Sequence, residues 1–200
     1  MFHMREKFHA SGVLWGERAP PQIYRDEKSA SCAQDRKLIV KTLFLVRHAK
    51  SSRDDPSLPD RERPLDDRGR QDAPTMGKRL GKRGVKPDLL LSSPALRALT
   101  TAQLIADEIA YSRKNIVVDE RLYAAGPDDL IAVICALDDK LDRVMLFGHN
   151  PAFADLAHRL SSEIIDMPTC AVAEFRFDAK AWADVGAVGP AKVKLDAPRK

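Results

Sequence analysis

The sequence predicts an α/β protein, a three-layer α/β/α sandwich on a mostly parallel sheet with an antiparallel edge strand. Short apolar runs at 42–46, 88–91 and 144–147 alternate with segments whose apolar residues recur at helical spacing. Continuous apolar runs are typical of strands covered on both faces, and their alternation with helices favours a parallel sheet. The segment 171–177 alternates apolar and polar residues, which predicts a half-exposed antiparallel strand near a sheet edge.

The first helix is expected from Asp66 or Asp67 to about Arg83. Gly84 ends it, because glycine readily follows the last helical turn. Pro74 lies inside this segment and lacks the N–H that a helix interior needs. We therefore expect Pro74 to kink the helix or to delay its start.

Two prolines mark later helix starts. Ser93 fits the N-cap, and Pro94 the first position, of a helix that continues to about residue 110. Asn150 and Pro151 repeat this pattern ahead of a helix that continues to about residue 160. The remaining predicted elements are a helix that opens at 126–129 and is apolar at helical spacing through 137, and strands at 115–118 and 191–195.

Composition excludes several classes of function. The 200 residues suffice for one domain. The sequence has 33 Lys and Arg residues and 29 Asp and Glu residues, a net charge of +4. This excess of basic residues is too small to predict a nucleic-acid partner. No apolar run approaches the length of a membrane span. Cys32, Cys135 and Cys170 are few and widely spaced, so neither a disulfide framework nor a metal site is predicted, and we expect a cytoplasmic protein without a membrane partner.

The first 40 residues differ from the rest of the chain. They show no sustained apolar period, contain the pair Pro20-Pro21 and are polar over 26–37. They also lack an apolar run long enough for a signal peptide, and acidic residues such as Glu6 and Glu17 argue against a transit peptide. Residues 1–40 are therefore expected to be a poorly ordered extension ahead of a domain at 41–200.

Four polar side chains follow the ends of predicted strands. Arg47 and His48 end the first strand, Arg97 lies in the first turn of the helix after the second, and His149 follows the fourth. Each alone is ordinary, since single histidines are usually structural and single arginines usually solvated. Parallel strands bring their carboxyl ends to one edge, where two guanidiniums and two imidazoles suit a phosphate dianion. A neutral imidazole can attack phosphorus without a separate base.

These residues belong to motifs that resemble the histidine phosphatase (phosphoglycerate-mutase-like) superfamily. The matching pieces occur in the family order over about residues 42–160: Leu45-Val46-Arg47-His48-Ala49, Arg63-Pro64-Leu65 through Gly69, Ser92 to Ala98 with Thr100-Thr101-Ala102, and Gly148-His149-Asn150-Pro151. The resemblance implies that His48 becomes a transient phosphohistidine. It also implies that Arg47, Arg97 and His149 bind the phosphoryl group, and that neither a metal nor another cofactor is required.

The sequence departs from the commoner family pattern after the nucleophile. Many relatives have Gly and Glu there, whereas this chain has Ala49 and Lys50, followed by Ser51, which we include among the substrate-binding residues. This variant is similar to the SixA-type branch of phosphohistidine phosphatases. Only about 50 residues separate Arg97 from His149, which leaves no room for a large lid. An open site would accept a phosphorylated side chain on a protein.

The general acid is less clearly marked. The stretch 119–123 resembles the one that carries the acid in mutase-like members, which makes Glu120 the candidate proton donor, with Asp128 and Asp54 as alternatives. The small branch is also consistent with no dedicated acid, because the imidazole of a phosphohistidine leaves more easily than an alkoxide.

Three functions remain open at this point. The first is a phosphatase acting on phosphohistidine in proteins, for example a histidine-containing phosphotransfer protein. The second is a small-molecule phosphomonoesterase, and the third is a non-catalytic phosphate-binding module. The intact set of His48, His149, Arg47 and Arg97 weighs against the third.

Overall fold

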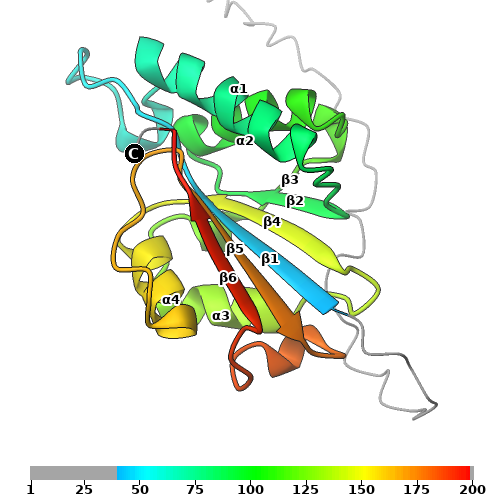
Figure 1. The fold of residues 1–200 in the computed structure, drawn as a ribbon. Coiled ribbons are helices and arrows are strands. Elements are labelled where there is room, and N and C mark those ends of the chain that lie inside the picture. Colours follow the sequence, from blue (N-terminus) through cyan, green and yellow to red (C-terminus); the bar gives the residue numbers. More distant parts are fainter. Residues whose placement is uncertain (1–39, 199–200) are drawn as a thin grey trace, which may run out of the picture.

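One mixed sheet forms the centre of the structure, a computed structural model that describes residues 40–198. Its strand order is β3-β2-β4-β1-β5-β6 (Figure 1). The strands are β1 (Val40–Arg47), β2 (Leu89–Ser92), β3 (Val117–Val118), β4 (Arg143–Gly148), β5 (Val172–Asp178) and β6 (Lys192–Asp196). The expected extension at 1–40 lies outside the described residues, except for its last residue.

The sheet is parallel over β1 to β4, as predicted. β5 pairs antiparallel with β1, and β6 pairs antiparallel with β5. The predicted antiparallel strand is therefore β5, but it lies one position inside the edge because β6 covers its outer side. Its polar face is less exposed than expected: Glu174 is only 4% exposed and pairs with Arg83 and Arg176. Neighbouring guanidiniums allow this carboxylate to be buried.

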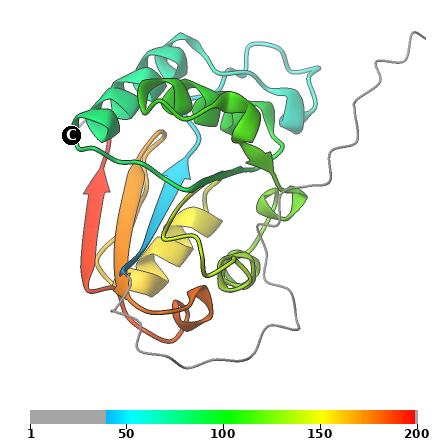
Figure 2. The ribbon, with the colours of Figure 1, turned by 90° about the vertical axis from the view of Figure 1, so that its right-hand side faces the viewer.

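Helices cover both faces of the sheet, which confirms the α/β/α sandwich (Figures 1 and 2). α1 (Asp67–Lys82) and α2 (Leu96–Glu108) lie on one face, and α3 (Pro127–Cys135) and α4 (Ala152–Ser161) lie on the other. Short 3₁₀ helices, η1 (Asp60–Glu62), η2 (Arg113–Asn115), η3 (Glu120–Leu122) and η4 (Trp182–Asp184), occur in the connections.

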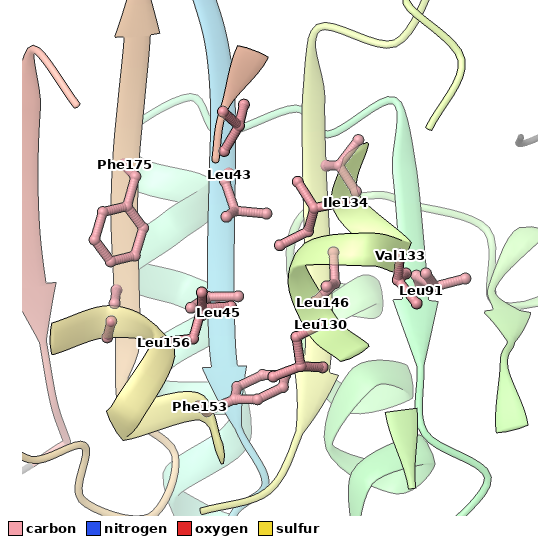
Figure 3. Close-up of a cluster of buried hydrophobic side chains, with 14 of the residues drawn as sticks. Leu43, Leu45, Leu91, Leu130, Val133, Ile134, Leu146, Phe153, Leu156 and Phe175 are labelled. Atoms are coloured by element: carbon pink, nitrogen blue, oxygen red, sulfur yellow. The ribbon is translucent and has the colours of Figure 1, made fainter. Parts of the chain in front are cut away.

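Successive residues of β1 supply the two separate cores. Leu43 and Leu45 pack toward α3 and α4, as Figure 3 shows. Phe44 and Val46 pack toward α1 and α2. This alternation follows from the two-residue period of a strand, and it explains why the run is apolar throughout.

The helix boundaries agree with the sequence at α1 and differ at α2. The Asp66 carboxylate caps α1 by accepting from the backbone N of Gly69 at 2.7 Å, and the helix contains Pro74 without a delayed start. α2 begins at Leu96 with Ala95 at the N-cap, so the predicted start at Ser93 and Pro94 is wrong. The Ser93 hydroxyl lies 2.8 Å from Nε2 of His149 and makes only a longer contact, 3.4 Å, with the backbone N–H of Ala95.

Strand register determines where the predicted site lies. Arg47 pairs with Gly148 across β1 and β4, and Ser92 pairs with Phe147 across β2 and β4. The residues that follow these three strands therefore emerge side by side at one edge of the sheet.

Among the described helices, none combines the length and apolar character needed to cross a bilayer.

Candidate active site

A hollow of about 270 Å³ lies at the carboxyl ends of β1, β2 and β4. Its walls bring together the four side chains that the sequence singled out, Arg47, His48, Arg97 and His149. They are joined there by Lys50, Ser51, Arg53, Asp60, Arg63, Asn150 and Thr169. The hollow is thus lined mainly by cations and imidazoles.

The backbone around His48 is held on three sides. The N–H of His48 donates to the carbonyl of Gly148 at 3.0 Å, and the carbonyl of His48 accepts from Cys170 at 3.1 Å. The N–H of Ala49 donates to Oγ1 of Thr101 at 3.0 Å, and that hydroxyl donates to the carbonyl of Arg97 at 2.6 Å. Thr101 therefore ties the segment that carries His48 to the helix that carries Arg97.

The ring of His48 has a defined tautomer. Its Nδ1 lies 2.7 Å from the carbonyl oxygen of Ala49. Because a carbonyl only accepts hydrogen bonds, Nδ1 must carry the proton, and Nε2 of the neutral ring keeps its lone pair. This arrangement leaves Nε2 able to act as a nucleophile.

Both imidazoles are kept neutral. Burial, with added repulsion from Arg97 and Arg47, lowers the pKa of His48 to about 4 against the lesser, opposing hydrogen bond to Ala49. Burial and then the charge of Arg97 lower the pKa of His149 to about 3. The two ring centroids lie 5.2 Å apart. At neutral pH neither ring therefore carries the second proton that would make it a cation and repel the guanidiniums.

We predict that NMR titration of the two imidazoles gives midpoints near pH 4 for His48 and pH 3 for His149, below the ordinary 6.5. The unfolded chain takes up these protons near pH 6.5, so acidification from there to pH 3 should lower the free energy of unfolding. Arg97→Ala removes a positive neighbour and should raise both midpoints. Midpoints near 6.5 in the folded protein would contradict this electrostatic description.

Arg97 is buried and is held by Asp60. Its Nη2 donates to Oδ2 of Asp60 at 2.8 Å, and its Nη1 donates to the carbonyl oxygen of the same residue. The Asp60 carboxylate also accepts from Arg63 at 3.0 Å and from the hydroxyl of Tyr123 at 3.1 Å. Desolvation opposes ionisation of Asp60, but these donors outweigh it and lower the pKa of Asp60 to about 2.

Arg47 offers a donor without a protein partner. Its Nη1 donates to the carbonyl of Met167 at 2.7 Å, whereas its buried Nε has no hydrogen-bond partner among the described residues. Buried N–H groups are nearly always paired, so an unpaired one on a residue that lines the hollow is a candidate donor to an oxyanion. The site can therefore bind a tetrahedral anion beside Nε2 of His48.

The other predicted site residues are placed differently. Ser51 lines the hollow, and its hydroxyl accepts from Nη2 of Arg63 at 2.9 Å. Glu120 does not line it: the side chain is 72% exposed and accepts from Nη2 of Arg61 at 2.8 Å. The alternatives are also outside, since Asp128 pairs with Arg159 and Asp54 accepts from Ser52.

Sequence reasoning missed Asp60 and gave Arg63 no role of its own. The motif that begins at Arg63 was a usable signal for that arginine. Asp60 lies in a proline-rich loop with no periodicity, so nothing in its neighbourhood distinguished it from other exposed carboxylates.

A family model and several relatives match this chain. The model of the histidine phosphatase superfamily, branch 1, matches residues 43–124. An uncharacterized chloroplastic protein of Arabidopsis thaliana is 30% identical over 169 residues, which cover 79% of this chain and 77% of that protein. The chain belongs to the histidine phosphatase superfamily. An uncharacterized protein of Mycobacterium tuberculosis is 34% identical over 165 residues, 77% of this chain and the whole of that protein.

Solved structures show the same fold. The SixA protein of Nakamurella multipartitia superposes with a TM-score of 0.66 at 22% identity, over 80% of this chain and 98% of that one. The protein histidine phosphatase SixA in complex with tungstate gives a TM-score of 0.64 at 22% identity, over 78% of this chain and 97% of that one. The fold of this superfamily member is therefore the compact SixA type.

Proposed function

We propose that the chain is a metal-independent phosphatase that removes the phosphoryl group from phosphohistidine in proteins, such as a histidine-containing phosphotransfer protein. Nε2 of His48 attacks phosphorus and forms a P–N bond while the substrate's own P–N bond breaks. The leaving imidazole takes its proton from solvent. Water then attacks phosphorylated His48, and inorganic phosphate and the free imidazole are released.

The hollow supplies the charge that this transfer needs. Arg47, Arg97 and His149 bind the oxygens of the phosphoryl group as charge spreads over them in the transition state. Preorganised donors of this kind account for most phosphoryl-transfer catalysis, and here the cations are arginines instead of a metal ion. Ser51 helps to place Arg63 beside the same oxygens.

The protonation state of the hollow favours phosphohistidine over an ester. Asp60 is the only carboxyl group among the described residues that line it, and its low pKa keeps it ionised at neutral pH. Neither imidazole carries a second proton there. An alkoxide leaving group needs a proton donor, whereas an imidazole departs more readily. Glu120 as a donor stays a prediction from the sequence, because the structure pairs it with Arg61 outside the hollow.

The deciding experiment compares turnover of a phosphohistidine protein with turnover of alkyl and aryl phosphates, with and without a chelator. We expect the phosphohistidine protein to be preferred over the alkyl esters and the chelator to have no effect. When variants of His48 are assayed in the same way, His158→Ala is a suitable control, because His158 lies exposed on α4. A clear preference for a small alkyl phosphate would favour the phosphomonoesterase instead, and loss of activity with chelator would refute metal independence.

A further inference from the structure

The hollow contains more positive charge than one phosphoryl group requires. Its lining includes five cations, Arg47, Lys50, Arg53, Arg63 and Arg97, and one carboxylate, Asp60, a net charge of +4 with both imidazoles neutral. A bound phosphoryl group contributes about −2. Roughly two positive charges are therefore left without a counterpart in the bound complex.

The surplus is located at the rim. Three of the five guanidinium or ammonium groups have protein partners: Arg97 pairs with Asp60, Arg63 with Asp60 and Ser51, and Arg47 with Met167. Lys50 and Arg53 are exposed, and within residues 40–198 neither side chain has an ion pair or hydrogen bond. We call these two side chains the rim cations. They carry the charge that remains once a phosphoryl dianion balances the net +2 of Arg47, Arg63, Arg97 and Asp60.

Nearby carboxylates are directed elsewhere. Asp54 accepts from the hydroxyl of Ser52 at 2.8 Å, and Asp55 accepts from the hydroxyl of Ser57 at 2.6 Å. Neither aspartate lines the hollow. Asp166 acts on Arg47 electrostatically, but it also lies outside the lining. The rim cations therefore face the hollow without an internal counter-charge.

The backbone under Lys50 is fixed, which gives its side chain a defined origin. The carbonyl of Lys50 accepts from the N–H of Asp66 at 3.1 Å. Gly69 packs against the same carbonyl so closely that a Cβ there would lie 2.1 Å from the oxygen. A short bridge joins the next residue, Ser51, to Leu65. The segment after the nucleophile is thus held against the start of α1.

We propose that Lys50 and Arg53 form a subsite for a second anionic group, and that the substrate is an acidic peptide segment whose carboxylates flank the phosphorylated side chain. The proposal rests on the proposed function and extends it to the sequence around the phosphohistidine. Exposed cations of this kind contribute mainly to the rate of encounter and to selection between partners. They do not touch the phosphorus atom in this scheme.

The test uses two phosphohistidine peptides of equal length, one with aspartates beside the phosphorylated residue and one with serines there. Lys50→Ala and Arg53→Ala are each expected to lower kcat/KM for the acidic peptide by about 3- to 10-fold. The loss should arise from a higher KM, and it should become smaller at high salt because salt screens exposed charges. The serine peptide should change less than about twofold. Arg70→Ala is the matched control, because it removes one exposed cation of α1 outside the hollow.

Equal losses for both peptides, or losses with Arg70→Ala as large as with Lys50→Ala, would overturn the subsite. A second pair of substrates separates this outcome from failure of the proposed function. Phenyl phosphate and a phenyl phosphate with a ring carboxylate need no phosphohistidine chemistry. If neither peptide is hydrolysed but the carboxylated ester alone depends on Lys50 and Arg53, the phosphohistidine assignment fails and the subsite stands. If neither peptide is hydrolysed and hydrolysis of the carboxylated ester does not depend on Lys50 and Arg53 either, the subsite fails.

Discussion

Replacement of His48 by alanine is expected to reduce phosphate release by roughly 10³-fold or more, the largest effect of any single change in this chain. The reason is chemical: in the proposed mechanism Nε2 of His48 is the unprotonated imidazole nitrogen that attacks phosphorus, and the carbonyl of Ala49 fixes the tautomer of the ring. A second expected result is the loss of a covalent phosphate adduct. The wild-type protein, quenched during turnover and analysed by mass spectrometry, should carry that adduct on the peptide that contains His48.

The variant should still bind phosphate, since Arg47 and Arg97 remain. Binding of inorganic phosphate measured by calorimetry, together with a melting temperature close to wild type, would show that chemistry and not folding was lost. His158→Ala should retain full turnover. Undiminished phosphate release by the His48 variant would show that the nucleophile has been assigned to the wrong residue.

Arg97→Ala is expected to lower kcat/KM by about 10²- to 10³-fold. The change removes a buried guanidinium that can donate to the phosphoryl oxygens. It also leaves the Asp60 carboxylate without its main partner, beside the position of the incoming dianion. Arg97→Lys should recover only part of the loss, because an ammonium group cannot donate in the planar, two-pronged manner of a guanidinium.

A double variant distinguishes these two contributions. If the stranded Asp60 carboxylate repels the substrate, adding Asp60→Asn to Arg97→Ala should restore activity by roughly 3- to 10-fold. Steady-state kinetics on all four forms would give the coupling between the two residues. Strictly additive losses would mean that Asp60 and Arg97 act independently, contrary to their hydrogen bonds in the structure.

Much of the site could be predicted because its residues follow strand ends. Arg47, His48 and His149 are each adjacent to a short apolar run that is typical of a buried strand. Parallel strands end at the same edge, so their neighbours must meet there without any knowledge of the loops. Arg97 follows by the same reasoning, since its helix begins directly after a strand.

The predicted helix start at Ser93 was wrong because it used only the neighbouring residues in the sequence. Its position ahead of Pro94 has the pattern of an N-cap, yet its hydroxyl lies 2.8 Å from His149. Hydrogen bonding to a neighbouring strand end competes with capping, and only the packed structure determines which partner is nearer. Similarly, Glu120 was selected by resemblance, whereas Arg61 holds it outside the hollow.

The α/β sandwich and the meeting of Arg47, His48, Arg97 and His149 at one sheet edge could be predicted from the sequence, because periodicity and strand ends are local properties of the chain. The roles of these residues in phosphoryl transfer stay predictions from the family resemblance. Only the tertiary structure shows that Asp60 reaches Arg97, 37 residues further along the chain, and that the rim cations have no partner within residues 40–198. Contacts between a loop without periodicity and a distant helix depend on how the loop packs, and no pattern within the loop encodes that packing. The pocket at Arg47 and His48 therefore depends both on local sequence patterns and on the packing of segments that are distant in the sequence.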